Sequence, residues 1–246
     1  MDWHLSTLCI KDLSDYLVNT HYKHMLKVKN IYKHFDGVQA LDDVYFEAKQ
    51  GEITGIIGPN GSGKSTFINV LTGMLGGENI TQESFSRTFQ DSRLWSHMTV
   101  LDTILISMGT RDVISSIFSY KSKTREALSV IEKVGLDHHV HTEARHLSYG
   151  QRKLLEIGRA VAGNTNILFL DEPFAGLFPE TIEIVKKIIR EENKRGVAIV
   201  LIEHDMSIIK ELCDYVYVLD GGRNIAQGKA EEVLANQIVK TAYLGD

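Results

Sequence analysis

The chain has 246 residues, of which 43% are hydrophobic and 24% charged, values typical of a globular protein with a sizeable core. The formal net charge of −5 argues against a nucleic-acid partner, because such a partner needs a basic face. The two cysteines, Cys9 and Cys213, are too few for a disulfide framework and fit a reducing cytosol. No apolar run approaches the roughly 20 residues that span a membrane, and no signal peptide is expected at the N-terminus, so a membrane role would depend on a partner.

Residues 1–24 stand apart from the rest of the chain. Apolar residues at helical spacing between Leu5 and Leu17 allow a short amphipathic helix. A strand-like pattern begins directly after Met25. Three interpretations stay open: a frayed extension, a start codon placed too early with Met25 as the true start, or a docking helix.

Alternating apolar and polar residues at 26–30 and 41–48 predict two half-buried antiparallel strands. Phe35 lies in the segment that joins them. Its ring has two equally good interpretations, which are stacking on a flat base and closing a hairpin core.

The motif Gly-Pro-Asn-Gly-Ser-Gly-Lys-Ser-Thr follows a short Ile-rich strand at 52–57 and precedes an apolar-faced helix at 67–72. Strand, glycine loop and helix form the context in which this pattern predicts a phosphate cradle. Glycine lets the backbone N–H groups approach phosphate oxygens, and the helix adds the positive end of its dipole. Lys64 can reach the β- and γ-phosphates, and Ser65 can offer its hydroxyl to Mg²⁺. The residues of the loop are Gly58, Pro59, Asn60, Gly61, Ser62, Gly63, Lys64, Ser65 and Thr66.

Beyond a break at residues 73–77, Thr99 and Asp102 predict the capped start of a helix, and a helical pattern continues to Leu136. The histidines of Asp137–His141, with His146 nearby, allow either a metal site or a solvated loop. No cysteine lies near them and their spacing fits no standard metal site, which favours the loop.

Residues 147–151, Leu-Ser-Tyr-Gly-Gln, hold a second helix start. Ser148 followed by Gln151 is a capping-box pattern, and apolar residues from Leu154 to Val161 then mark one helix face. The free N–H groups at this start make it a second candidate anion site, although a plain capped helix would be the default interpretation if the motif stood alone.

The near-continuous apolar run at 166–170 predicts a parallel strand that is buried on both faces. Asp171 and Glu172 follow at its C-terminal end, where open α/β sheets bind ligands. Asp171 can hold Mg²⁺ through water, and Glu172 can polarise a water beside the γ-phosphate. A solvated strand end is the alternative, which the phosphate loop in the same chain disfavours.

The last third of the chain continues the alternation of helices and strands. A helix at 181–195, a buried strand at 197–202 and a final helix at 230–234 are predicted. His204 follows the strand at 197–202, so it lies at the ligand edge of the sheet. The strands 215–219 and 224–227 pair across Asp220-Gly-Gly-Arg223 as a hairpin.

Together these motifs resemble those of the ATP-binding cassette (ABC) ATPases over residues 26–246. The motifs occur in the family's order at 58–66, Gln90, 147–151, 167–172 and His204. The resemblance implies an α/β fold with a phosphate-loop core, a mainly parallel sheet, a small, trimmed antiparallel β subdomain and a helical subdomain at about residues 91–157. Residues 25–246 would form this ATPase domain after the extension at 1–24.

The resemblance also implies the reaction, ATP and water to ADP and phosphate, and the roles of matching residues. Phe35 looks like the aromatic residue that stacks on adenine, and Lys64 like the lysine that binds the phosphates. Glu172 resembles the general base for the attacking water. His204 resembles the histidine that bonds the γ-phosphate, and Gln90 resembles the residue that senses Mg²⁺ and the γ-phosphate.

ATP and Mg²⁺ are the implied cofactors. Ser65, Gln90 and Asp171 are the implied ligands of the metal ion. Ser148, Gly150 and Gln151 resemble residues that contact ATP held by a second cassette, identical or different. Two cassettes would then close head-to-tail around two nucleotides.

The resemblance implies a cytoplasmic protein on the inner face of the cell membrane, bound to an integral permease that docks near Gln90–Met98, and no nucleic-acid partner. Segments at 87–90, 155–157, 203–206 and 242–245 look like those of branched-chain amino-acid importers and their urea and amide relatives. Transport ATPases for lipopolysaccharide export share much of this pattern, so that alternative stays open. A soluble scaffold or mechanical cassette, and an inactive cassette, are further alternatives.

Three departures from the family pattern stand out. The segment between Lys64 and Gln90 is short, which indicates a trimmed antiparallel subdomain. Phe178 stands where the family usually has Asp or Asn, in the loop that couples the two nucleotide sites. Tyr149 replaces a commoner glycine, as relatives of this subgroup accept.

Overall fold

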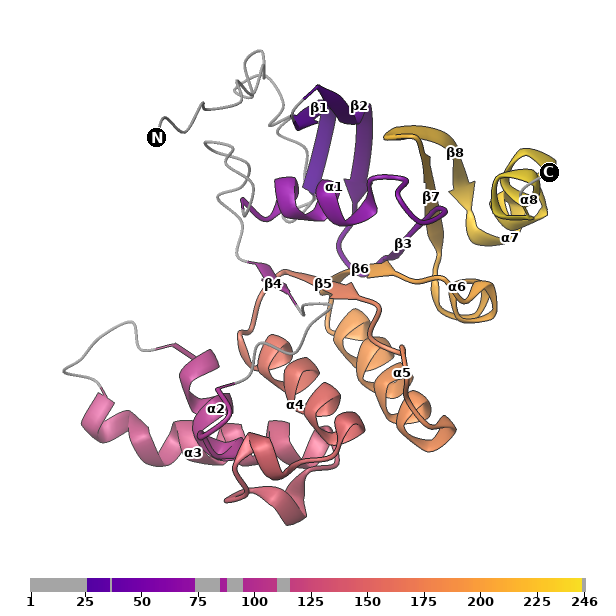
Figure 1. The fold of residues 1–246 in the computed structure, drawn as a ribbon. Coiled ribbons are helices and arrows are strands. Elements are labelled where there is room, and N and C mark those ends of the chain that lie inside the picture. The colour runs from indigo at the N-terminus through magenta and orange to yellow at the C-terminus, as the bar shows by residue number, and fades with distance from the viewer. Residues whose placement is uncertain (1–25, 36, 74–84, 88–94, 110–115, 245–246) are drawn as a thin grey trace. The chain divides into compact units, whose positions relative to one another are not determined.

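The computed structural model describes residues 26–35, 37–73, 85–87, 95–109 and 116–244 (Figure 1). The chain divides into two compact units. The first combines Met1–Ser84 with Val200–Asp246, and the second comprises Phe85–Ile199. The N-terminal extension at 1–24 and Gln90 lie outside the described residues.

The first unit opens with the antiparallel pair of strands that the sequence predicts. Strand β1 (Leu26–Phe35) pairs with β2 (Val38–Ala48), from Leu26 opposite Ala48 to Phe35 opposite Val38. Both strands are longer than predicted, because the ladder continues through the polar residues around the turn. The ring of Phe35 is 38% exposed, so it does not close a hairpin core.

An aromatic cluster forms the core beneath this hairpin. Phe46 on β2 contacts Phe67 on helix α1 (Lys64–Leu71) edge-on, with ring centroids 5.4 Å apart. Its ring centroid lies 5.0 Å from that of Tyr217 on β7 (Tyr215–Asp220). Figure 1 shows α1 beside the hairpin. Burial of these large rings therefore fixes β2 against both α1 and β7.

The strands of the first unit place the phosphate loop. Strand β3 (Ile53–Ile57), buried at every position, runs parallel to β7 and leads into the loop. Strand β8 (Arg223–Lys229) pairs with β7 in antiparallel register, which confirms the predicted hairpin. The helices that complete this unit are α6 (Met206–Leu212), α7 (Ala230–Ala235) and α8 (Gln237–Leu244). The sequence analysis did not predict α8.

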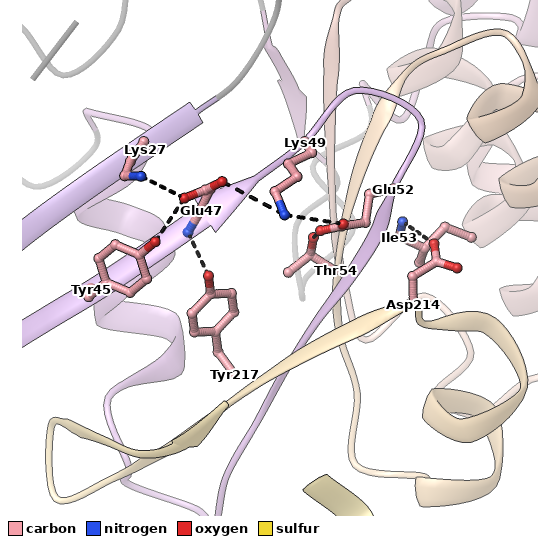
Figure 2. Close-up of polar contacts among 9 residues, drawn as sticks. All are labelled: Lys27, Tyr45, Glu47, Lys49, Glu52, Ile53, Thr54, Asp214 and Tyr217. Carbon is pink, nitrogen blue, oxygen red and sulfur yellow. Dashed lines mark hydrogen bonds and ion pairs between the residues drawn. The ribbon is translucent and has the colours of Figure 1, made fainter. Parts of the chain in front are cut away.

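A polar cluster joins β2 to β7 on the same unit (Figure 2). The Glu47 carboxylate accepts hydrogen bonds from Lys27 Nζ at 2.9 Å and from Tyr45 Oη at 2.8 Å. The Tyr217 hydroxyl accepts the backbone N–H of Glu47 at 3.1 Å. Asp214 in turn accepts the backbone N–H of Ile53 at 2.9 Å. These contacts satisfy polar groups around the buried start of β3.

The helical part of the second unit lies between residues 95 and 163. Thr99 caps helix α2 (Val100–Ser107) by accepting the Asp102 N–H at 3.1 Å, as predicted. The prediction of one helical pattern to Leu136 is wrong at Gly109, which has φ 65° and closes the end of α2. Helix α3 (Ser116–Lys133) then packs with α2 against α4 (Tyr149–Ala162). Two short 3₁₀ turns, η2 (Asp137–His139) and η3 (Ala144–His146), connect α3 to α4.

The remainder of the second unit carries the acidic strand end. Strand β5 (Ile167–Asp171) is buried at every position and runs parallel to β4 (Phe85–Arg87). Helix α5 (Pro179–Lys194) begins two residues before the prediction, because Pro179 is suited to the first helical position. Strand β6 (Ala198–Ile202) follows Gly196, as predicted, and the boundary between the two units lies within it.

In the ranges that the structure describes, no helix has the length and apolar content needed to cross a lipid bilayer.

Candidate functional site

Backbone geometry shapes the loop at 58–66. Gly58, Gly61 and Gly63 have φ values of 157°, 80° and 99°, in the region that favours glycine. A Cβ on Gly58 would lie 2.1 Å from the carbonyl oxygen of Leu219. A Cβ on Gly63 would lie 2.8 Å from that of Ala40. The loop therefore takes this path only with glycine at positions 58 and 63, as expected for a backbone that cradles phosphate.

Lys64 folds back onto the loop that precedes it. Its ammonium group donates to the carbonyl oxygens of Gly58 at 2.7 Å and Pro59 at 2.9 Å. The residue is only 7% exposed. These carbonyl oxygens are neutral acceptors. Charged phosphate oxygens form stronger hydrogen bonds with an ammonium group. Sequence analysis predicted that Lys64 binds phosphate, but not these contacts of its ammonium group with the loop carbonyls.

The turn between β7 and β8 supports the loop. The N–H of Gly222 donates to the carbonyl of Ser62 at 3.1 Å, and the carbonyl of Gly222 accepts the N–H of Asp42 at 2.8 Å. A Cβ on Gly222 would lie 2.6 Å from the Ala40 oxygen, and its φ is 77°. Gly222 therefore joins β2 to the phosphate loop, a role that sequence analysis missed although the Gly-Gly pair was visible as a turn.

Two other predicted residues of the first unit have defined surroundings. The ring of Phe35 is partly exposed, and the Lys33 ammonium group lies 5.1 Å from its centroid. His204 is the second residue after β6 and is exposed, and its backbone N–H donates to the Glu203 carboxylate at 3.2 Å. An exposed ring and an exposed imidazole after a strand end are both accessible to a ligand.

The second unit contributes the start of α4. Ser148 Oγ accepts the Gln151 N–H at 3.3 Å, and Gln151 Oε1 accepts the Ser148 N–H at 2.8 Å. This reciprocal pair confirms the predicted capping box. Gly150 lies in the first turn, with Thr181 Oγ1 at 3.8 Å from the position of a Cβ. The first N–H groups of a helix have no partner within it, so this start has the geometry of an anion site.

Exposed aromatic residues lie at the starts of α4 and α5. Tyr149 is 51% exposed, and its hydroxyl donates to the carbonyl of Ala175 at 3.2 Å. Phe178, the residue directly before α5, is 79% exposed. Its side chain makes no capping hydrogen bond for α5.

The acidic strand end contains an ion pair that sequence analysis missed. Asp171 Oδ2 lies 3.1 Å from Arg87 Nη2, and both side chains are almost fully buried. Burial raises the pKa of the Asp171 carboxyl, and the hydrogen bond and charge of Arg87 oppose that rise. Glu172 follows with φ 48°, an unusual conformation for a residue other than glycine. Such strained backbone is often found at functional sites.

The structure gives no support to a metal site at the histidines. Within the described ranges, no three or more His, Cys, Asp or Glu side chains are placed to hold a metal ion. His138 pairs with Asp137 at 3.3 Å in solvent, and His139 contacts Gln151 instead. The predicted loop is a 3₁₀ turn.

The residues predicted to hold Mg²⁺ fit that ion in ligand type. Ser65 is exposed in the first turn of α1 and carries a hydroxyl oxygen, and Asp171 carries a carboxylate. Mg²⁺ prefers such oxygen donors and usually keeps several waters. Because Asp171 Oδ2 is already paired with Arg87, contact through water suits it better than direct ligation.

The chain is similar in sequence and in structure to known proteins. The sequence model of the family described as ABC transporter matches residues 41–175. The high-affinity branched-chain amino acid transport ATP-binding protein LivG of Salmonella typhimurium is 36% identical, over 90% of this chain and 98% of its own length. The probable LivG of Archaeoglobus fulgidus is also 36% identical, over 90% and 95%. The ADP conformation of an ATP-binding cassette of an ABC transporter has 33% identity, a TM-score of 0.76 and coverage of 90% and 98%.

Proposed function

The chain belongs to the ABC transporter family, and we propose that it is the ATPase subunit of an importer for branched-chain amino acids or related small polar solutes. The observation that carries this proposal is the pair of helix starts, one on a glycine loop with its lysine and one in a Leu-Ser-x-Gly-Gln capping box. The two relatives are named as branched-chain amino acid transport proteins, and each aligns with 90% of this chain. Their names therefore support this class of transported solute.

Nucleotide binding begins at the phosphate loop. The N–H groups of residues 58–66 surround the phosphates, and Lys64 exchanges the Gly58 and Pro59 carbonyls for phosphate oxygens. Phe35 stacks on the adenine with its exposed ring. Ser65 offers its hydroxyl to Mg²⁺, which when bound neutralises charge on the phosphates.

Hydrolysis needs a water held for attack on the γ-phosphate. Glu172 orients that water and takes up its proton, from a backbone conformation that directs the residue away from the regular path of β5. His204, exposed after β6, hydrogen-bonds the γ-phosphate. Asp171 supports Mg²⁺ through water, and Gln90 senses the same ion.

A second cassette completes the assembly. Ser148, Gly150 and Gln151 present the start of α4 to ATP held by the partner, so that ATP joins two cassettes and hydrolysis separates them. Residues 25–246 form one cassette, which contains a helical subdomain at about residues 91–157. Residues 1–24 form an extension that precedes the cassette.

An integral permease docks near Gln90–Met98 and holds the cassette at the inner face of the membrane. Trp95 is 52% exposed, and the Arg159 guanidinium lies 5.7 Å from its ring. An exposed Trp beside an Arg is typical of protein interfaces, where both residue types are enriched.

The variant Glu172→Gln tests the mechanism. Removing the base should lower the hydrolysis rate by at least about 100-fold while ATP binding persists, and the ATP-bound pair of cassettes should accumulate. Steady-state phosphate release and size-exclusion chromatography with ATP measure the two effects. The exposed Glu231 on α7 is the matched control, and Glu231→Gln should leave both unchanged. Full turnover by Glu172→Gln would contradict the assignment.

A further inference from the structure

One histidine of the turn before α4 contacts the capping box directly. His139 Nε2 lies 2.9 Å from Gln151 Nε2, and His139 is the last residue of η2. The other end of the same amide, Gln151 Oε1, accepts the backbone N–H of Ser148 at 2.8 Å. Three residues thus form a chain of contacts that ends on the first residue of the Ser-Tyr-Gly-Gln segment.

The direction of each hydrogen bond in this chain is fixed by chemistry. A backbone N–H can only donate, so the Gln151 atom that faces Ser148 must be the carbonyl oxygen. The amide nitrogen, which can only donate, therefore faces His139. His139 Nε2 must then be the unprotonated acceptor, with the proton of the neutral ring on Nδ1. Nδ1 faces Thr142 Oγ1 at 3.5 Å, an acceptor within reach of a weak contact.

The backbone around His139 holds the imidazole in place. Its N–H donates to the carbonyl of Leu136 at 2.8 Å, and its carbonyl accepts the N–H of Thr142 at 2.8 Å. Val140 and Thr142 in turn accept the N–H groups of Leu101 and Val100, each at 3.0 Å, at the start of α2. His139 is therefore carried by a turn tied to α2 and lies half-buried rather than on a free loop.

We propose that His139 is a positioning residue for the start of α4. By accepting from Gln151 Nε2, the imidazole holds the glutamine amide across the Ser148 N–H, which keeps Ser148 and Gly150 in the geometry that faces the partner's ATP. The inference rests on the proposed function, because it assigns that start of α4 to ATP in a second cassette. It adds a residue outside the Leu-Ser-Tyr-Gly-Gln segment and a specific tautomer.

Paired substitutions test whether the acceptor matters. His139→Leu removes it, whereas His139→Gln keeps an acceptor at the end of a side chain of similar reach. In the Glu172→Gln background, His139→Leu should raise the ATP concentration needed for dimerisation by about 10-fold, while His139→Gln should stay within about 2-fold. ATP binding by the separate cassette should be unchanged in both. His138, whose side chain is 92% exposed, supplies the control variant His138→Leu, which should behave as the parent.

Nitrogen NMR of the folded protein at pH 8, with histidine ¹⁵N labelling and His139→Gln for assignment, reads the tautomer independently of dimerisation. A neutral ring protonated on Nδ1 is expected. An Nε2-protonated ring, or equal weakening of dimerisation by His139→Leu and His139→Gln, would overturn the proposal.

A further variant separates failure of this inference from failure of the proposed function. If Ser148→Ala weakens ATP-dependent dimerisation and His139→Leu does not, the positioning role is wrong and the role of α4 stands. If neither variant weakens it, the assignment of α4 to the partner's ATP is itself wrong. If both weaken it and His139→Gln does not, both proposals hold.

Discussion

The phosphate loop of the first unit and the start of α4 in the second unit are both helix starts, yet they are built by different means. The loop at 58–66 takes its shape from glycine backbone and from the turn at Gly222, and its cation rests on backbone carbonyls. The start of α4 takes its shape from side chains, which are Ser148, Gln151 and His139.

This difference predicts how each site responds to change. A backbone cradle tolerates many side chains around it but no added Cβ at its crowded positions. A site shaped by side chains instead depends on every donor and acceptor in its chain of hydrogen bonds, so loss of one side chain weakens the whole site. Damage to the first should therefore abolish nucleotide binding by one cassette, whereas damage to the second should weaken the pairing of two.

The largest effect is expected for Gly58→Ala. The added Cβ would lie 2.1 Å from the Leu219 oxygen and 2.6 Å from Ser62 Oγ, so the loop must move and its N–H groups must leave their positions. Loss of two hydrogen bonds to charged phosphate, at about 1.5 kcal/mol or more each, should weaken ATP binding by at least about 100-fold. Titration with a fluorescent ATP analogue measures this affinity.

Gly73→Ala is the control for this change. Gly73 also has a positive φ, of 68°, but a Cβ there meets nothing within 4 Å. It should cost about 1 kcal/mol of folding stability and leave ATP affinity unchanged. Equal loss of affinity in both variants would mean that strain, and not the crowding at Gly58, is responsible.

A comparable effect, on folding stability and not on ATP affinity, is expected from the buried ion pair at the end of β5. Arg87→Met leaves the Asp171 carboxylate buried beside an apolar side chain, and loss of one partner of such a pair costs about 3 kcal/mol of folding stability. Urea unfolding followed by circular dichroism measures the loss.

The double variant Arg87→Met/Asp171→Asn gives the matching control. Without the carboxylate charge, most of the lost stability should return, because an uncharged amide is less costly to bury. If the double variant is no more stable than Arg87→Met, the loss comes from packing around Arg87 and not from the buried charge.

The features that the sequence predicted are those that neighbouring residues determine. The loop at 58–66, the Thr99 cap and the capping box at Ser148 follow from short patterns whose partners lie within a few positions. The apolar run that became β5 and the alternating strands β1 and β2 follow from periodicity.

The features that it missed join distant positions. Arg87 and Asp171 are separated by 84 positions, and Gly222 reaches the phosphate loop from the far end of the chain. Hydrophobic periodicity predicts local elements and does not indicate which distant residues come into contact. His139 was visible, but its histidine neighbours suggested a metal site or a solvated loop, and only the direction of the Gln151 amide shows what it contacts.

The smallest effect is expected in the cluster of Figure 2, where two carboxylates of one unit have opposite pKa shifts. Burial alone would raise the pKa of Glu47, but hydrogen bonds from Lys27 and Tyr45 outweigh it and lower that pKa. Burial raises the pKa of Glu52. A lowered pKa means that ionised Glu47 stabilises the fold above its unfolded pKa, and that this stability is lost as the pH falls through the folded pKa. A raised pKa means the reverse for Glu52.

Glu47→Gln should therefore cost about 1 kcal/mol of folding stability at pH 7, and the difference from the parent should shrink as the pH falls below the ordinary glutamate pKa of 4.5 and through the lowered folded pKa. Glu52→Gln should cost nothing at pH 7 or add slightly to stability, because it removes a charge that burial disfavours. Urea unfolding at pH 7 and over a series of lower pH values down to about 3 measures both. Neither variant changes a residue of the phosphate loop or of α4, so ATP affinity and dimerisation should be unchanged. A fall in either would show that the polar cluster around Glu47 is coupled to the phosphate loop. A pH-independent loss for Glu47→Gln would instead assign the effect to shape, since the hydrogen bonds of Lys27 and Tyr45 strengthen the fold only while the carboxylate is ionised.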